Sequence, residues 1–365
     1  MKIGMIGFRG IPHTYGGGDE FIRYLGPGLA ARGNKVVVYC WSQLFKDKSK
    51  YYNGVERIFI PTFNHKSLGQ LYLSTVAVIH MLFIKVDIVY IHTLPSGLHS
   101  IIPWLFRKKI VVNTDGFDWL RDKWGIIGKT YFKLSARVVT FTANRLVSDA
   151  EGIRDYYLRK FNVDSTVIAY GANIETTKNK DLIKEFGVEP YGYFLIACRF
   201  VPENNISLII SAFEKVKTDK KLLIAGAANY KSDYFDKCKS TKDARIKFLG
   251  HISDYNTMKE LHCNCYAYLH GHSMGGTNPA LLKALGYGNC ILALDTVFNR
   301  EVLDDKYGII FKNDVNDLVN KLQEIIENPS KAENYRRNAP NRITEAYTWE
   351  KIINDYEKLF KSVLS

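Results

Sequence analysis

A glycine-rich stretch near the start of the chain has the composition of an anion-binding loop. Residues 7–21 read GFRGIPHTYGGGDEF, with consecutive glycines at 16–18. Glycines let a backbone approach a ligand closely, and the amide groups at the start of the helix predicted from about Asp19 can donate to an anion. A tight turn without a ligand is the alternative, and Glu20 can simply complement the helix dipole.

A second candidate anion site combines an arginine with another glycine stretch. Arg199 directly follows an apolar run, and an arginine at the end of a strand can hold a diphosphate through paired charge-assisted hydrogen bonds. Gly275, Gly276 and Thr277 precede a helix predicted to begin near Asn278, where proline at the first position and exposed amides make an anion cradle without a metal. A surface ion pair for the arginine and an ordinary helix cap for the loop are the alternatives.

Metal and disulfide chemistry are not indicated. His270 and His272 would share one face of a strand, but no third ligand lies near them, so we expect no zinc site. The six cysteines show no CxxC pair, which favours reduced cysteines in the cytosol. The chain begins with a strand-like segment at residues 1–7, so we expect no signal peptide.

The elements that must position these residues alternate between apolar strands and helices. The predicted strands are 2–7, 35–40, 87–92, 109–113, 137–142 and 165–169, then, after the polar stretch 175–184, 193–198, 221–225, 246–249, 265–269, 290–294 and 308–311. Apolar runs without polar alternation indicate parallel sheets that are covered on both faces. We therefore predict two doubly wound α/β domains, at 1–175 and 176–345, facing across a cleft, with ligands at the carboxyl ends of the strands. Residues 346–365 form one more helix with an apolar stripe.

The charge distribution points to an anionic partner of the first domain. The net charge is +13, and residues 1–175 alone hold 23 Lys and Arg against 13 Asp and Glu. Residues 101–109, IIPWLFRKK, place apolar side chains beside basic ones, an arrangement that favours binding to an anionic membrane surface. A lysine-rich solvated surface and a core helix ending at a basic turn are the alternatives. The apolar stretch 71–91 is interrupted by Lys85 and Asp87, so we predict a helix and a strand rather than a membrane span.

Several motifs in order carry a resemblance to a known family. They are Arg9-Gly10-Ile11-Pro12, Tyr15-Gly16-Gly17 with Glu20, Asn113-Thr114-Asp115-Gly116 followed by Trp119, Arg121 and Lys123-Trp124, Val201-Pro202-Glu203-Asn204-Asn205, the HGH and GGTNP segments of 270–279, Asn299-Arg300-Glu301-Val302, and Tyr347-Thr348-Trp349-Glu350. With them the chain resembles the GT-B glycosyltransferases of family 4, and more narrowly the bacterial rhamnosyltransferase-like group (beta-1,4-rhamnosyltransferase-like). The resemblance spans nearly the whole chain.

The resemblance implies two Rossmann-like domains, with the C-terminal helix returning to the first. It also implies a retaining, metal-independent sugar transfer from a nucleotide sugar, a deoxythymidine-diphosphate (dTDP) rhamnose or a UDP-sugar. The expected acceptor is a lipid-linked saccharide at the inner face of the cell membrane, used in surface polysaccharide synthesis. The implied catalytic residues are Arg199, Asp115 and Glu20; the donor-binding residues are Gly16, Gly17, Arg199, Asn205, His272, Gly275, Gly276, Thr277, Asn278 and Lys283; the acceptor-binding residues are Tyr15, Glu20, Trp119 and Arg121. For Asp115 a turn or cap role, and for Trp119 simple packing, are the alternatives.

The chain departs from the family pattern at two positions. Lys283 stands where many family members have a glutamate that binds the nucleotide ribose, and Asn205 lies near where a lysine usually follows the arginine. The charge reversal at Lys283 allows a changed nucleotide, a changed pose or lost activity. A catalytically silent sugar-nucleotide-binding or scaffold protein is therefore the alternative function. The chain lacks GxGxxG, which disfavours a nicotinamide-dependent epimerase or dehydrogenase, and it has no nucleic-acid-binding motif.

Overall fold

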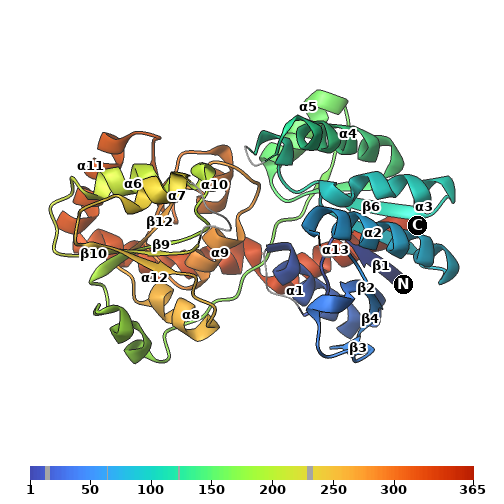
Figure 1. Ribbon diagram of the computed structural model, residues 1–365, viewed down its shortest axis with the longest axis horizontal. Helices are drawn as coiled ribbons and strands as arrows, with labels where there is room; N and C mark the ends of the chain where they lie inside the picture. Colours follow the sequence, from blue (N-terminus) through green and yellow to red (C-terminus); the bar gives the residue numbers. More distant parts are fainter. Residues whose placement is uncertain (13–16, 64, 122–123, 228–232) are drawn as a thin grey trace. The chain divides into compact units, whose positions relative to one another are not determined.

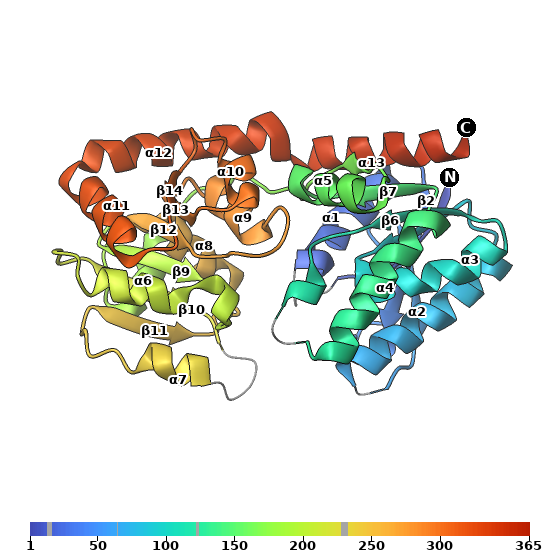
Figure 2. The ribbon, with the colours of Figure 1, turned by 90° about the horizontal axis from the view of Figure 1, so that it is seen from above.

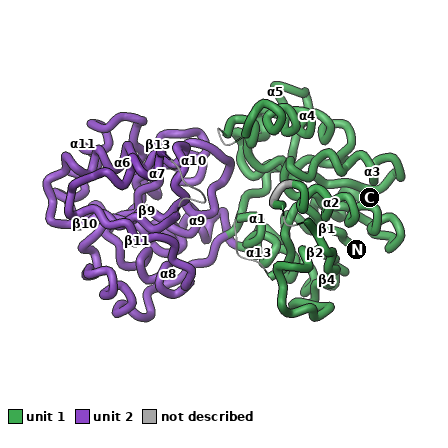
Figure 3. Tube along the Cα trace, in the orientation of Figure 1, with its two compact units in different colours: residues 1–171, 349–365 green, residues 172–348 purple. Residues whose placement is uncertain are grey.

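The chain folds into two compact units. A computed structural model describes residues 1–12, 17–63, 65–121, 124–227 and 233–365. Unit 1 comprises Met1–Gly171 together with Trp349–Ser365, and unit 2 comprises Ala172–Thr348 (Figure 3). The second unit is thus inserted into the first, because the chain returns to unit 1 after completing unit 2.

Unit 1 is built on an eight-stranded sheet in the order β3-β4-β2-β1-β5-β6-β7-β8 (Figure 1). Its strands are β1 (Lys2–Ile6), β2 (Lys35–Trp41), β3 (Tyr51–Tyr52), β4 (Val55–Ile60), β5 (Ile88–His92), β6 (Lys109–Asn113), β7 (Arg145–Ser148) and β8 (Thr166–Val167). All neighbouring strands are parallel except the edge pair β3 and β4. The strand order reverses between β1 and β5, the position where doubly wound sheets bind ligands.

Helices cover both faces of this sheet. They are α1 (Gly17–Ala31), α2 (Lys66–Phe83), α3 (Ile101–Leu105), α4 (Ile126–Thr142), α5 (Glu151–Phe161) and α13 (Trp349–Leu364). Figure 2 shows α2, α3 and α4 on one side of the sheet and α13 on the other. The last helix packs closely on α1, since a Cβ added to Gly28 would lie 2.3 Å from Cδ1 of Ile353. The apolar stripe of α13, from Ile352 to Val363, is buried, as the sequence pattern predicts for a helix that packs on a domain.

Unit 2 has a six-stranded parallel sheet in the order β11-β10-β9-β12-β13-β14. Its strands are β9 (Tyr193–Ala197), β10 (Lys221–Ala225), β11 (Ile246–Gly250), β12 (Ala267–His270), β13 (Ile291–Leu294) and β14 (Ile309–Phe311). Its helices are α6 (Ile206–Phe213), α7 (Asp233–Lys239), α8 (Tyr255–Cys263), α9 (Pro279–Gly286), α10 (Val297–Leu303), α11 (Val315–Glu327) and α12 (Pro329–Arg342), followed by the π-helical turn Ile343–Tyr347. Here the order reverses between β9 and β12. The predicted pair of doubly wound α/β domains is confirmed.

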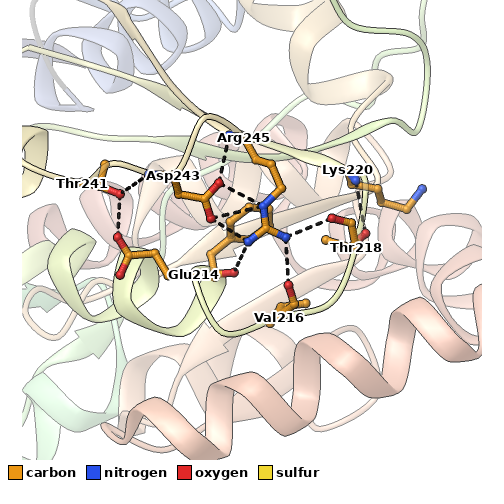
Figure 4. Close-up of polar contacts among 8 residues, drawn as sticks. Glu214, Val216, Thr218, Lys220, Thr241, Asp243 and Arg245 are labelled. Atoms are coloured by element: carbon orange, nitrogen blue, oxygen red, sulfur yellow. Dashed lines mark hydrogen bonds and ion pairs between the residues drawn. The ribbon is translucent and has the colours of Figure 1, made fainter.

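A partly buried cluster around Arg245 lies at the edge of the unit 2 sheet, where β11 begins. The guanidinium donates to the carbonyl oxygens of Phe213, Val216 and Thr218 at 3.2, 2.8 and 2.9 Å (Figure 4). These bonds hold the segment that follows α6 against the start of β11. It also binds Asp243 through two nitrogens, the shorter contact being 2.6 Å. Arginine suits this place because its planar fork offers five donors at once.

Two segments differ from the prediction or refine it. The predicted strand at residues 137–142 is wrong, because these residues form the end of α4 and the strand follows at β7. Its β-branched composition, RVVTFT, suggests a strand, but buried Val138, Val139 and Thr142 continue the apolar face of a helix that begins at Ile126. Residues 71–91 do split into a helix, α2, and a strand, β5. No helix in the described parts of the chain is long and apolar enough to cross a membrane.

Candidate functional site

The candidate site of unit 1 lies where β1 and β5 end, at the reversal of strand order. Gly7 follows β1 with a φ of +100°, and a Cβ at this residue would lie 2.0 Å from the carbonyl oxygen of His92. Only glycine fits such an approach. A Cβ on Gly18, in the first turn of α1, would lie 3.1 Å from Nε2 of the same histidine. The loop after β1 and the start of α1 therefore converge on His92.

His92 is buried between aromatic rings. Its imidazole stacks on Phe8 and Phe21 at centroid distances of 4.6 and 5.0 Å, and its Nδ1 lies 3.2 Å from the hydroxyl of Tyr90. Burial lowers the pKa of His92 to about 4, although Asp115 and Asp19 act in the opposite direction. The ring is therefore neutral at physiological pH and can accept or donate one hydrogen bond at each nitrogen.

Asp115 stands just beyond the end of β6, as predicted, and a buried tyrosine binds it. The hydroxyl of Tyr170 donates to Oδ2 of Asp115 at 2.7 Å and lies 3.5 Å from Nε2 of His92. Burial, with the nearby carboxylates, raises the pKa of Tyr170 well above its ordinary value, so the phenol stays protonated and remains a donor. The backbone amide of Asp115 donates to Oδ1 of Asn113 at 2.8 Å. The hydroxyl of Tyr170 thus orients the carboxylate, and the side chain of Asn113 holds the backbone that carries it.

The C-terminal helix takes part in the same network. The hydroxyl of Tyr356, on α13, accepts hydrogen bonds from Nδ2 of Asn113 at 3.1 Å and from the hydroxyl of Tyr90 at 3.2 Å. All three side chains are buried. Because Asn113 in turn receives the amide of Asp115, α13 helps to fix the loop that carries this carboxylate.

The other predicted residues of unit 1 are placed differently. Trp119 is buried in an aromatic cluster with Phe117 and Tyr156, at centroid distances of 5.4 and 5.6 Å. Arg121 forms an ion pair with Asp118 at 3.1 Å. Glu20 is partly exposed in the first turn of α1, which begins at Gly17, whereas Tyr15 and Gly16 lie outside the described residues. The described part thus brings Gly17 and Glu20 onto the helix that approaches His92.

In unit 2 the loop that carries Arg199 and the glycine loop before α9 lie side by side and are hydrogen-bonded to each other. They follow the adjacent strands β9 and β12, at the reversal of strand order. Nδ2 of Asn205 donates to the carbonyl oxygen of Gly271 at 2.8 Å, and Oγ of Ser273 donates to that of Glu203 at 3.0 Å. A Cβ on Gly271 would lie 2.3 Å from the carbonyl oxygen of Asn204, so the loops contact each other at backbone distance.

Arg199 projects from the first of these loops. Its side chain is exposed, and within the described residues no hydrogen bond or ion pair holds its guanidinium. Its carbonyl oxygen, in contrast, accepts a hydrogen bond from Nδ2 of Asn204 at 2.8 Å, which fixes the backbone below it. An arginine with a fixed backbone and an unpaired guanidinium is suited to an anionic ligand.

The second loop ends in the amino terminus of α9. The side chain of Asn278 caps the helix by accepting the amide of Ala280 at 2.9 Å, and Pro279 occupies the first helical position. Gly275 has a φ of +119°, and a Cβ built there would meet no atom within 4 Å. Gly276 and Thr277 are buried between this glycine and the helix. The backbone at Gly275 is therefore open on the side where a Cβ would lie.

Two histidines lie beside this loop. The rings of His270, the last residue of β12, and His272, which follows the strand, stack at 4.1 Å with an angle of 12° between their planes. Burial drives the pKa of His270 well below its ordinary value, with a further contribution from His272, so the His270 ring is neutral. The carbonyl oxygen of His272 accepts from Nδ2 of Asn299 at 3.1 Å. The described residues contain no group of three or more side chains that could hold a metal ion.

Lys283 lies one turn into α9 and is partly buried. Burial, with a smaller contribution from the positive charge of Lys283, lowers the pKa of His262 to about 4, while the hydrogen bond of that imidazole to Asn289 acts in the opposite direction. The ammonium group therefore lies close enough to α8 to act on a buried histidine. Its position on the helix that follows the glycine loop keeps it among the candidate donor residues.

Solved structures share this two-unit fold. Sucrose-phosphate synthase of Thermosynechococcus elongatus superposes with a TM-score of 0.81 at 16% identity, covering 99% of this chain and 98% of that one. HepE of Anabaena in complex with UDP-glucose has a TM-score of 0.78 at 16% identity, with coverage of 99% and 100%. The predicted GT-B fold is thereby confirmed.

The family comparisons divide at the boundary between the units. Residues 175–342 match the family model described as Glycosyl transferases group 1, and residues 1–173 match a domain of unknown function, DUF1972. An uncharacterized glycosyltransferase of Methanocaldococcus jannaschii is 24% identical over 248 residues, which are 64% of this chain and 62% of that protein. The aligned region thus spans less than two thirds of that relative. Unit 2 thus matches the group 1 glycosyl transferase model within a chain of GT-B fold.

Proposed function

We propose that the protein is a retaining glycosyltransferase that moves a sugar from a nucleoside-diphosphate donor to a lipid-linked saccharide in bacterial surface polysaccharide synthesis. The observation that carries this proposal is the junction of the Arg199 loop with the Gly271–Asn278 region, within the segment that matches the group 1 family. The UDP-glucose bound by HepE supports a nucleotide sugar as the donor class. Rhamnose, carried by dTDP, is the sugar that we propose, with a UDP-sugar as the second choice.

In this proposal unit 2 binds the donor and stabilises the leaving group. The guanidinium of Arg199 pairs with the diphosphate, and the backbone around Gly275 and Gly276 approaches its oxygens at the amino terminus of α9. As the glycosidic bond breaks, negative charge grows on the diphosphate, and fixed donors stabilise that charge without a metal ion. Asn205 holds the arginine loop against the glycine loop, and His272, Thr277, Asn278 and Lys283 complete the donor site.

In the same proposal unit 1 binds the acceptor. Asp115, oriented by Tyr170, accepts a hydrogen bond from the acceptor hydroxyl, and Glu20 with Tyr15 and Arg121 binds the rest of the saccharide. Trp119 packs in the core beneath these acceptor-binding residues. Attack occurs on the face that the diphosphate leaves, and the departing phosphate takes the hydroxyl proton, so the anomeric configuration is retained. No second carboxylate is needed in that scheme.

A nucleotide-sugar panel tests the proposal directly. The full chain is incubated with dTDP-rhamnose and several UDP-sugars, with and without EDTA, and release of nucleoside diphosphate is measured with a polyprenyl-diphosphate saccharide as acceptor. Arg199→Ala should lower kcat by about 10²–10³-fold, the usual effect of removing a group that stabilises a developing oxyanion. Arg337→Ala, on the exposed surface of α12, is the matched control. Unchanged turnover in Arg199→Ala, or turnover that requires a divalent ion, contradicts the mechanism.

The second candidate is the silent sugar-nucleotide-binding protein, which the lysine at position 283 favours. Calorimetric binding of a nucleotide sugar without turnover of any donor, in the presence of the acceptor, would establish it. Recovery of turnover in Lys283→Glu would then identify this residue as the cause.

A further inference from the structure

Three neighbouring helices of unit 1 expose an unusual amount of apolar surface. Helices α2, α3 and α4 lie side by side on one face of the sheet (Figures 1 and 2). Of the 22 large apolar side chains that are exposed in the described parts, 12 belong to these helices or to the residue after α3, and only 4 belong to unit 2. The 12 are Leu68, Tyr72, Ile79, Phe83, Ile101, Trp104, Leu105, Phe106, Ile126, Ile127, Leu134 and Phe141. Apolar residues gathered in this way mark an interaction surface.

The most exposed of them begin α4. Ile126 and Ile127 are 86% and 88% exposed, so almost nothing in the described chain covers them. Leu134 and Phe141 continue the same side of the helix, and Phe141 contacts Trp104 of α3 edge to face at 6.4 Å. The apolar surface therefore passes from one helix to the next. We call the exposed residues of these three helices the α2–α4 surface.

Charge identifies the kind of partner. The sequences of α2, α3 and α4 contain no Asp or Glu. Lys129, Lys133 and Arg137 lie on α4, Arg107 lies two residues after the end of α3, and Lys109 begins β6. In the described parts of the chain none of these five forms an ion pair. A surface that is apolar, basic and free of carboxylates complements a layer that is apolar inside and anionic outside.

We propose that the α2–α4 surface docks on an anionic phospholipid bilayer. Ile126 and Ile127 insert below the headgroups, and Lys129, Lys133 and Arg137 contact the lipid phosphates. Apolar insertion combined with a basic cluster is the pair of signals that makes surface binding stable. This inference rests on the proposed function only for its setting, a lipid-linked acceptor, because the residues that carry it belong to neither the donor nor the acceptor site.

Flotation with vesicles tests the docking. The full chain should float with vesicles of phosphatidylcholine and phosphatidylglycerol at 3:1 and much less with phosphatidylcholine alone, and the binding should weaken as salt rises. The double variant Ile126→Glu with Ile127→Glu should bind at least about tenfold more weakly, since it removes two inserting side chains. Replacing Lys129, Lys133 and Arg137 by Gln should remove the preference for anionic lipid. Leu158→Glu, on α5, is the matched exposed control and should float like the original protein.

Other outcomes would overturn the inference. Absence of flotation at low salt, or equal flotation of the Ile126 and Ile127 variant, contradicts the docking. A dimer in light scattering that the same variant dissociates, with vesicle binding unchanged, would instead assign this surface to a second copy of the chain. Calorimetric binding of a nucleotide sugar is measured on every variant, so that a failure of lipid binding is distinguished from a failure of the proposed transferase.

Discussion

The hydroxyl of Tyr170 donates to Oδ2 of Asp115 at 2.7 Å, just beyond the carboxyl end of β6. Tyr170→Phe removes this donor and leaves the backbone in place. A hydrogen bond to a charged group contributes about 1.5–3 kcal/mol, so we expect kcat to fall about 10–100-fold with little change in the donor KM. Steady-state kinetics measures both constants.

A double-mutant cycle separates positioning from a general structural role. If Tyr170 acts through Asp115, the double variant with Asp115→Asn should be no slower than Asp115→Asn alone. Independent, additive losses would contradict the assignment.

Contact between the two loops of unit 2 predicts a donor-binding defect. In Gly271→Ala the new Cβ would lie 2.3 Å from the carbonyl oxygen of Asn204, so the loops must separate. We expect at least about a tenfold weaker Kd for the nucleotide sugar, because a shift of the arginine loop loses charge-assisted contacts. Calorimetry gives the Kd directly. Gly125→Ala meets no atom within 4 Å and serves as the control; equal affinity in both variants would refute the expectation.

The Arg245 cluster predicts a stability effect away from the site. Arg245→Met removes the guanidinium from three carbonyl oxygens and from Asp243, which keeps its hydrogen bond from the backbone amide of residue 245 (Figure 4). The free energy of unfolding should fall by about 2–4 kcal/mol, as for other partly buried charge networks. Urea unfolding followed by circular dichroism measures it. Arg154→Met, which breaks exposed ion pairs only, should cost less than about 1 kcal/mol, and a similar loss in both variants would count against the cluster.

The contacts of α13 with unit 1 predict that a substitution in this helix lowers the stability of unit 1. Tyr356→Phe removes the acceptor of Asn113 and the partner of Tyr90, both buried. We expect a loss of about 1–2 kcal/mol in unfolding free energy. Tyr51→Phe changes an exposed tyrosine and should leave stability unaltered. Thermal denaturation of the two variants at one pH compares them, and equal melting temperatures would contradict the role of Tyr356.

Buried neutral histidines predict a loss of stability in acid. The pKa values of His92 and His262 are about 4 in the folded chain, below the ordinary value of 6.5. Between these limits the unfolded chain binds more protons than the folded chain, so stability should rise from pH 4 to about 6.5 and then level off. Each histidine contributes up to about 3 kcal/mol over this range. Urea unfolding at pH 5 and 7.5 tests the trend; His262→Gln should make it shallower, and a pH-independent stability would refute it.

Much of the architecture could be predicted because it depends on local pattern. Apolar runs such as 109–113 and 221–225 coincide with β6 and β10, and the asparagine and proline at 278–279 begin α9. Residues 137–142 could not be assigned locally, because β-branched residues suit a strand while packing on the sheet keeps them helical. The two-residue edge strand β3 and its neighbour β4, with the sequence VERIFI, likewise lacked a strong apolar run.

Candidate site residues could be predicted from the sequence only where their position directly after a strand identified them. Asp115 and Arg199 each follow a strand, and that signal placed them at a carboxyl edge. His92 ends the apolar run of β5 and offered the same signal, which was missed. Tyr356 offered none, because it lies 243 residues from Asn113 and meets it only through the tertiary fold.

Since unit 2 interrupts unit 1, the ribosome makes α13 only after it has synthesised the whole second unit. Until residues 349–364 are made, the surface of α1 around Gly28 that packs against Ile353 stays uncovered, and Asn113 lacks its hydrogen-bond partner Tyr356. A chain that stops near residue 348 would therefore damage the half of the molecule that was synthesised first.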